Sequence, residues 1–157
     1  MYYIYSITNN WNNRKYYGQT SNIKRRLSQH KSALKAGRHK NEELQKDYNS
    51  CINRYKKKEL ISYDIIFETD TKEKAGILEN LCVFDALASK EKPYNILLKE
   101  YCYILNYIKM YKEFDNVISD NLILYCYYTG VIGIYKFKEV CKTLNRAHLL
   151  KITGVIK

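Results

Sequence analysis

Two short segments near the N-terminus, residues 2–8 and residues 15–18, are runs of β-branched and aromatic residues. An asparagine-rich cluster, residues 9–13, separates them, and asparagine favours turns because it tolerates left-handed backbone and bonds its own backbone. The pattern therefore predicts an antiparallel hairpin. Tyr5 and Tyr16 lie on its two strands, and a suitable register would make them cross-strand neighbours.

Apolar residues at helical spacing follow this hairpin. Thr20 or Ser21 can cap the helix that they predict, and Gly37 is placed to end it. A second short helix is predicted over residues 41–49. Partial alternation over residues 62–68 predicts a third strand.

A third helix is predicted over residues 72–89, capped by Thr71 and stopped before Pro93. Within it, residues 75–84 are uncharged except for Glu79. A helix that is apolar on nearly all sides is buried on more than one side. A lone carboxylate there is costly unless it is paired or bound to a cation. Glu79 is therefore a candidate metal ligand.

The composition changes after residue 97, where the chain becomes near-neutral and rich in Tyr, Ile and Leu. We expect an N-terminal domain over residues 1–97 and a helical C-terminal region over residues 98–157. Residues 136–154 could hold two short helices about Asn145, a weak indication of a helix-turn-helix element for DNA binding. The plainer interpretation, an extra helical layer or a dimerisation surface, is favoured.

The positive charge of the protein is concentrated in one segment. The 157 residues carry 27 Lys and Arg against 16 Asp and Glu, a net charge of +11. Residues 14–58 alone contain 14 basic and three acidic residues, so they hold the whole excess. Such a field predicts contact with the phosphates of nucleic acid or of a membrane surface. A membrane is disfavoured because the basic residues are interleaved with strands and helices and form no amphipathic anchor.

Composition excludes several other classes of protein. With 46% hydrophobic residues the chain can build a core, which excludes a wholly disordered protein. Its five cysteines include no C-x-x-C pair, which indicates reduced thiols and gives no zinc-finger signal. No signal peptide or membrane span is predicted. We expect a cytoplasmic protein, located in the host cytoplasm if a phage or virus encodes it.

Several residues with the chemistry for phosphodiester hydrolysis come together in these predicted elements. Arg26 and His30 lie four positions apart, so they project from one helical face. A single buried carboxylate suits Mg²⁺, which keeps most of its waters and bridges to a phosphate. Arginine supplies planar donors for the charge that develops on a phosphoryl group. Hydrolysis also needs an activated water and a group that receives its proton.

The two hairpin strands carry a paired motif. Residues 3–5, Tyr-Ile-Tyr, are followed eleven residues later by Tyr-Tyr-Gly at residues 16–18. This resembles the signature of the GIY-YIG nuclease family, most of all its phage and intron homing-endonuclease branch. Tyr3 and Tyr17 depart from the family's first glycine and middle isoleucine. The resemblance continues through Arg26, His30, Gly37, Arg38, His39, Leu44, Gln45, Asn49, Glu79, Asn80, Tyr94, Asn95 and Ile96.

The resemblance implies an α/β (α+β) fold, with a small three-stranded antiparallel sheet flanked by helices. It implies a Mg²⁺-dependent DNA endonuclease, with Mn²⁺ as a substitute, that hydrolyses phosphodiester bonds in double-stranded DNA and is homing-type or phage-encoded. The alternatives are a restriction-type or host-DNA-degrading endonuclease and a catalytically weak nucleic-acid-binding protein of the same fold. A homodimer is left open.

The family pattern also implies roles for individual residues. Tyr5 would pass the proton of the nucleophile, with His30 close enough to relay it. Tyr16 would orient the phosphate or the water, Arg26 would stabilise the charged transition state, and Glu79 would hold the metal. The residues expected to bind the substrate or support the site are His39, Asn95, Lys15 and Arg25.

Overall fold

The computed structural model describes residues 1–52, 60–95, 118–130 and 132–156. Part of the basic segment and the first part of the predicted C-terminal region therefore lie outside the described residues. The chain divides into two units, residues 1–83 with 91–96 and residues 84–90 with 97–157. The boundary expected after residue 97 stays a prediction, and the structure groups the short segment 84–90 with the C-terminal unit.

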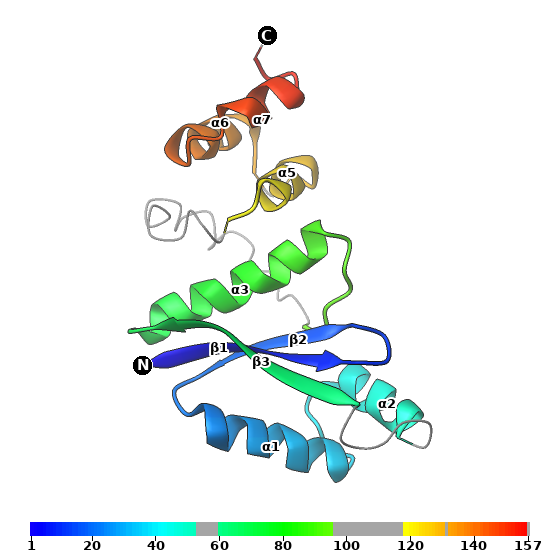
Figure 1. Cartoon of the computed structure of the whole chain (residues 1–157). Coiled ribbons are helices and arrows are strands. Elements are labelled where there is room, and N and C mark those ends of the chain that lie inside the picture. Colours follow the sequence, from blue (N-terminus) through cyan, green and yellow to red (C-terminus); the bar gives the residue numbers. More distant parts are fainter. Residues whose placement is uncertain (53–59, 96–117, 131, 157) are drawn as a thin grey trace. The chain divides into compact units, whose positions relative to one another are not determined.

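The first unit is built on a three-stranded antiparallel sheet, as the resemblance implied. Its strands are β1 (Tyr2–Asn9), β2 (Lys15–Thr20) and β3 (Ile61–Thr69), in the order β2-β1-β3. β1 is thus central and β2 is an edge strand (Figure 1). The predicted hairpin and the third strand are confirmed.

The register of the hairpin offsets the two tyrosines of the paired motif. Tyr5 lies opposite Gly18, and Tyr16 lies opposite Ile7. Paired residues share a face, and so do residues two apart along a strand. Tyr5 and Tyr16 are therefore diagonal cross-strand neighbours on one face of the sheet.

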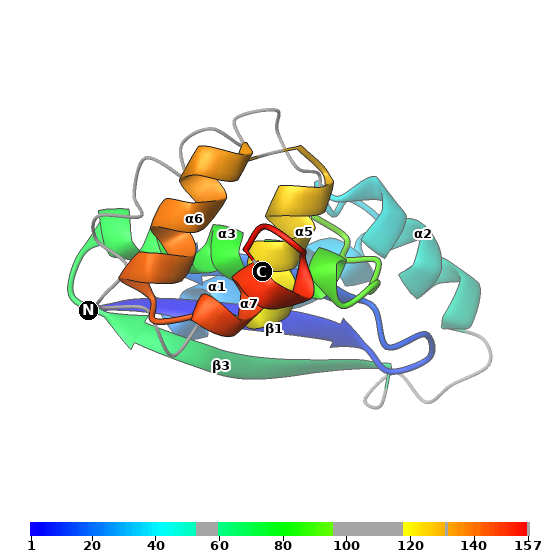
Figure 2. The ribbon, with the colours of Figure 1, turned by 90° about the horizontal axis from the view of Figure 1, so that it is seen from above.

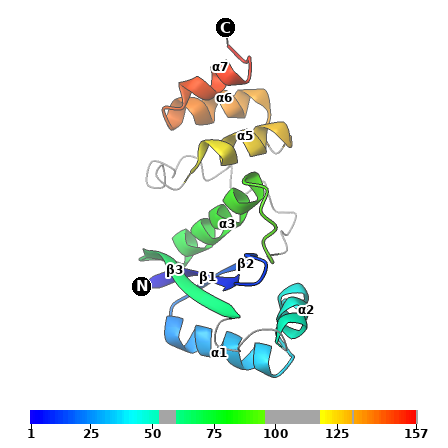
Figure 3. The ribbon, with the colours of Figure 1, turned by 45° about the vertical axis from the view of Figure 1, so that its right-hand side comes forward.

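Two helices follow β2 and lie on one side of the sheet (Figures 1 and 3). They are α1 (Ile23–Lys35) and α2 (Glu42–Cys51). The side chain of Asn22 caps α1, because the hydroxyl of Thr20 instead accepts the backbone N–H of Asn22 and shapes the turn before the helix. The predicted caps were therefore wrong, whereas Gly37 follows the helix end with the positive φ of +69° that glycine permits.

Helix α3 (Lys72–Ala88) begins on the opposite side of the sheet (Figures 1 and 3). The hydroxyl of Thr71 accepts the backbone N–H of Lys74 at 3.2 Å, which confirms the predicted cap. The main core of the first unit lies between the sheet and helices α1 and α2. It consists of Tyr5, Ile7, Leu34, Leu44, Tyr48, Cys51, Leu60 and Tyr94.

The second unit contains three described helices, α5 (Asp120–Tyr128), α6 (Ile134–Thr143) and α7 (Ala147–Ile152), seen together in Figure 2. Helices α6 and α7 flank Asn145, which has a positive φ of 55°. The prediction of two short helices about this residue is confirmed. Phe137 stacks on Tyr127 with ring centroids 4.2 Å apart. No helix in the described ranges combines the length and the apolar character that a bilayer crossing requires.

Candidate active site

Tyr5 stands at the centre of a buried polar cluster between β1 and α1. Its side chain is fully buried, yet its hydroxyl oxygen lies 2.7 Å from Nε2 of His30. Nε of Arg26 donates to the same oxygen at 3.1 Å. The i, i+4 spacing of Arg26 and His30 on α1 therefore aims both side chains at one phenol group.

Gly18 makes room for the Tyr5 side chain. A Cβ atom at residue 18 would lie 2.5 Å from the hydroxyl oxygen of Tyr5 and 2.6 Å from its Cζ. Real Cβ atoms do not approach other atoms this closely, so any larger residue would displace the ring. The close approach of the Tyr5 ring thus explains why the Tyr-Tyr-Gly motif has glycine at residue 18.

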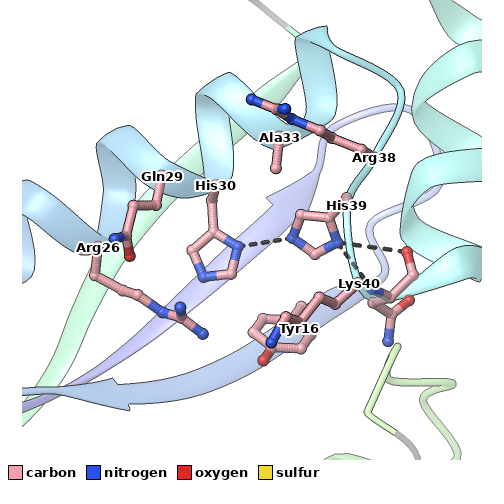
Figure 4. A pocket seen from close by; sticks show the side chains of 9 residues that line it. Tyr16, Arg26, Gln29, His30, Ala33, Arg38, His39 and Lys40 are labelled. Carbon is pink, nitrogen blue, oxygen red and sulfur yellow. Dashed lines mark hydrogen bonds between the residues drawn. The ribbon is translucent and has the colours of Figure 1, made fainter.

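His39 extends the cluster beyond His30, as Figure 4 shows. Nδ1 of His30 and Nε2 of His39 are 2.7 Å apart. The backbone N–H of Asn41 donates to Nδ1 of His39 at 3.1 Å. The backbone N–H of His39 itself donates to Oε1 of Gln45 at 2.8 Å. Both ring nitrogens of His39 are therefore held by other groups of the protein.

Gln45 fixes the loop between α1 and α2 on which His39 lies. Its amide nitrogen donates to the backbone oxygen of Leu34 at 3.1 Å and to Oδ1 of Asn49 at 2.9 Å. Gln45 thus ties the end of α1, the loop and α2 together. The sequence motif contained Gln45, but only the folded loop shows what this side chain does.

A pocket of about 390 Å³ opens beside this cluster. The ring of Tyr16 stands at its wall, with its centroid 5.5 Å from that of His30 and 6.1 Å from that of His39. Figure 4 shows that the lining side chains come from β2, α1 and the loop that follows α1. The pocket is lined by Tyr16, Arg26, Gln29, His30, Ala33, Arg38, His39, Lys40 and Asn41.

Burial sets the protonation states of the cluster. It raises the pKa of Tyr5 to about 12, an effect that the hydrogen bond and the charge of Arg26 partly oppose. Burial, followed by the charges of Arg26 and His39, lowers the pKa of His30 to about 3. Burial also lowers the pKa of His39. At neutral pH, Tyr5 is therefore protonated and both histidines are uncharged.

Glu79 lies on α3 and acts on the same cluster. Burial raises the pKa of its carboxyl group, while a hydrogen bond from Gln19 and the charge of Arg26 oppose this. The charge of Glu79 in turn raises the pKa of Tyr16 and, more weakly, that of Tyr5. Glu79 is therefore within electrostatic reach of the phenol and guanidinium groups.

Gln19 is a site residue that the sequence reading missed. It follows Gly18 directly on β2, and its side chain lies between β2 and α3, since a Cβ atom on Gly76 would be 3.4 Å from Nε2 of Gln19. Strand alternation could have predicted its position, because it places residue 19 on the face of the sheet opposite Tyr16. Glu79 lies on that same side, where Gln19 bonds to it.

The donor set around Glu79 fits a hard divalent cation. Within the described ranges, no three His, Cys, Asp or Glu side chains form a metal-binding group. Glu79 would thus be a lone anionic ligand, with the amide of Gln19 beside it. Mg²⁺ is bound in this way, with water and substrate phosphate completing its shell, whereas zinc sites use three or four protein ligands. Burial disfavours the charged form of Glu79 and raises its pKa, and a cation bound there would favour the charged form.

The remaining predicted residues lie outside the cluster. Asn95 holds the backbone of Tyr17, accepting its N–H at 2.8 Å and donating to its carbonyl at 2.9 Å. The backbone carbonyl of Lys15 accepts the N–H of Tyr94 at 2.8 Å. Arg25 is exposed on α1. In the described part of the chain, no contact joins the side chain of Lys15 or Arg25 to Tyr5, and their binding roles stay predictions.

The sequence matches a known protein family. Residues 1–95 match the family model of the GIY-YIG catalytic domain. The chain therefore belongs to the GIY-YIG nuclease family, and this membership implies DNA endonuclease activity.

The fold can also be set beside that of a solved structure. The chain is similar to the catalytic domain of the intron endonuclease I-TevI, solved as a point mutant, with 28% sequence identity and a TM-score of 0.49. The match covers 62% of this chain and 95% of that one. None of the curated proteins matches the sequence significantly.

Proposed function

We propose that this protein is a metal-dependent endonuclease that hydrolyses phosphodiester bonds in double-stranded DNA, with Tyr5 receiving the proton of the attacking water. The observation that carries the proposal is the position of the Tyr5 hydroxyl, fully buried between Arg26 and His30. A buried phenol between a guanidinium and an imidazole is suited to proton transfer, because hydrogen bonds to its charged form favour that form.

The energetic demand on Tyr5 is large. Its pKa of about 12 lies about five units above neutral pH, which corresponds to about 7 kcal/mol for forming the phenolate. The bond from Arg26 is charge-assisted once the phenolate forms, so its strength rises as the proton leaves. A divalent cation on Glu79 would add positive charge near the reacting groups and lower the pKa of a bound water.

Arg26 and Tyr16 are placed to act on the phosphate. Arg26 interacts with the hydroxyls of both Tyr5 and Tyr16 and lines the pocket. Its guanidinium would neutralise the charge that develops on the phosphoryl oxygens. Tyr16 would orient the phosphate from the pocket wall.

The charge around the pocket supports a phosphate-bearing substrate. Arg38 and Lys40 line it together with Arg26. Arg14, by contrast, is paired with Glu43 and Asp47, so its charge is already compensated. The basic residues that line the pocket therefore place positive charge where a phosphate would bind.

Substitution of Glu79 tests the proposal. Glu79→Gln should abolish Mg²⁺- or Mn²⁺-supported cleavage of double-stranded DNA and leave DNA binding unchanged or stronger, because it removes the anionic ligand and one negative charge. Glu73→Gln, an exposed change on the same helix, is the matched control and should cleave normally. Cleavage by the parent protein in EDTA, or by the Glu79→Gln variant, would remove the metal from this account. Binding without any cleavage by the parent would favour the alternative of a catalytically weak DNA-binding protein.

Within the nucleases we favour a homing-type or phage-encoded endonuclease, because the motif pattern most resembles that branch. End-mapping of the products from a complex DNA pool separates this from a restriction-type or host-DNA-degrading enzyme. Cuts at one long site support homing, whereas cuts at a short recurring site support restriction, and scattered cuts support degradation.

A further inference from the structure

The hydrogen bonds that lead from Asn41 to Tyr5 have a direction. A backbone N–H can only donate, and that of Asn41 lies 3.1 Å from Nδ1 of His39. The carbonyl of Asn41 is farther from this nitrogen, at 3.4 Å. Nδ1 of His39 must therefore offer a lone pair, so the neutral ring carries its proton on Nε2.

The direction passes from His39 to His30. Nε2–H of His39 donates to Nδ1 of His30 across 2.7 Å. Nδ1 of His30 is then an acceptor, and the proton of this neutral ring lies on Nε2. Nε2–H of His30 donates to the hydroxyl oxygen of Tyr5, also across 2.7 Å. Each imidazole thus fixes the tautomer of the next one.

Tyr5 consequently accepts two hydrogen bonds, one from His30 and one from Nε of Arg26. Its own proton has to point away from both donors. That proton has to pass to solvent water before Tyr5 can take up the proton of the attacking water. The phenolate that remains then has two donors already in place, and no ring has to turn. In the opposite tautomer, Nε2 of His30 would accept the hydrogen bond of the Tyr5 hydroxyl, and Tyr5 would accept only the bond from Arg26.

We propose that His39 is a positioning residue, which holds His30 in the Nε2–H tautomer and thereby makes Tyr5 an acceptor from two sides. This inference rests on the proposed role of Tyr5. It gives His39 a different task from the substrate contact expected from the sequence. It also makes His30 a donor to Tyr5 in place of the proton relay expected there.

Asn41, where this series of hydrogen bonds begins, is held in place by its own side chain. The side chain of Asn41 caps α2, accepting the backbone N–H of Leu44 at 2.9 Å, and also donates to the carbonyl of Tyr94. His39 is 8% exposed and His30 is 5% exposed, so water has little access to either ring. The fixed Asn41 peptide is thus the element that decides the tautomer of both rings.

Nitrogen-15 NMR of the histidine rings tests this directly in the full-length protein without DNA or metal. The protein has three histidines, and a His148→Gln variant identifies the signals of the third, exposed one. We expect His30 and His39 each to show a protonated Nε2 and an unprotonated Nδ1. A protonated Nδ1 on His30, or rapid averaging of its two tautomers, would overturn the proposal.

Two substitutions at residue 39 connect the tautomer with the rate. His39→Gln keeps an N–H donor for His30, so it should preserve the His30 tautomer and a single-turnover rate within about tenfold of the parent. His39→Glu offers only an acceptor, so it should move the His30 proton to Nδ1 and lower the rate by about 100-fold or more. Equal losses in the two variants would contradict the positioning role.

The two readouts separate this inference from the proposed function. Correct tautomers in a protein that cleaves no DNA would refute the nuclease proposal and leave the tautomer assignment standing. Normal cleavage by a protein in which His30 is protonated on Nδ1 would refute the tautomer assignment and leave the nuclease proposal standing. If His39→Glu does not fold, the spectrum of the parent and the His39→Gln variant still decide the question.

Discussion

The side-chain amide of Asn95 binds both the N–H and the carbonyl of Tyr17, as the backbone of a neighbouring strand would. Strand β2 lies at the edge of the sheet in the described part of the chain, and Asn95 occupies the place that a further strand would take there. Of the two flanking residues, Tyr16 lines the pocket and Gly18 packs against the ring of Tyr5. Asn95 therefore positions the site through the backbone.

Replacing Asn95 should weaken both the fold and cleavage. Asn95→Ala leaves two partly buried backbone groups without their partner, which should lower the free energy of unfolding by about 1–3 kcal/mol. Urea denaturation measures this change, and single-turnover kinetics should show a slower cut. Asn121→Ala, an exposed change on α5, is the control. An unchanged stability in Asn95→Ala would show that water replaces the amide.

The hydroxyls of Tyr5 and Tyr16 should matter far more for the rate than for the fold. Tyr5→Phe keeps the ring and removes the atom that receives the proton, so the single-turnover rate should fall by about 10²–10⁴. Tyr16→Phe should also slow the reaction, because the phosphate would lose an orienting hydroxyl. Tyr128→Phe, at an exposed position, should cleave normally. Small and equal effects in all three variants would mean that these tyrosines only pack.

The contact between Gly18 and Tyr5 predicts a steric effect. In Gly18→Ala the new methyl group would have to displace the Tyr5 ring, and overpacking of this kind costs about 1–3 kcal/mol. The hydroxyl would also leave its two donors, so the cleavage rate should fall together with the stability. Gly133→Ala is the matched control because no atom lies within 4 Å of the added Cβ. A fully active Gly18→Ala variant would contradict the arrangement of Tyr5 described above.

The buried histidines predict how stability depends on pH. The pKa of His30 is lowered to about 3, and that of His39 is also lowered, so the unfolded chain binds protons near pH 6.5 that the folded chain does not bind. Stability should therefore fall as the pH drops from about 6.5 towards 3, by up to about 1.4 kcal/mol per pH unit for each histidine. Glu79, whose pKa is raised, acts in the opposite direction.

Urea denaturation at several pH values measures this dependence. His30→Gln should flatten the loss of stability below pH 6.5, because glutamine takes up no proton in either state. A parallel dependence in the parent and the His30→Gln variant would show that His30 does not carry the effect.

The positive charge predicts a strong effect of salt on DNA binding. If about five phosphates are neutralised, the logarithm of the binding constant should fall with the logarithm of salt concentration at a slope of about −4 to −5. Arg38→Gln and Lys40→Gln should each reduce the slope by about one, because both residues line the pocket. Arg14→Gln should change it less, since Glu43 and Asp47 already pair with this arginine. A slope near zero would exclude contact with the DNA backbone.

Local signals allowed most of the first unit to be predicted. The hairpin, the end of α1 at Gly37 and the start of α3 at Thr71 each depend on residues close in the sequence. The N-cap of α1 was missed because three consecutive residues are all good caps, and only the turn made by the Thr20 hydroxyl selects Asn22. Local chemistry alone does not rank such neighbours.

Long-range contacts account for what the sequence did not reveal. The residues that surround Tyr5 were found because a known motif orders them along the chain. The bond of Gln19 to Glu79 and the bonds of Asn95 to Tyr17 join residues about 60 and 78 positions apart, and depend on strand register and helix placement. The hydrogen-bond direction along the two histidines depends on a single peptide of a loop. No periodicity in the sequence records these relationships.

The side-by-side course of residues 94–95 and β2 has a consequence for synthesis of the chain. The edge of β2 is closed by residues that leave the ribosome about 75 positions after it. Until then, the backbone of Tyr17 lacks its two bonds to the side chain of Asn95. The backbone next to the pocket wall therefore gains these bonds only after nearly all of the first unit has been made.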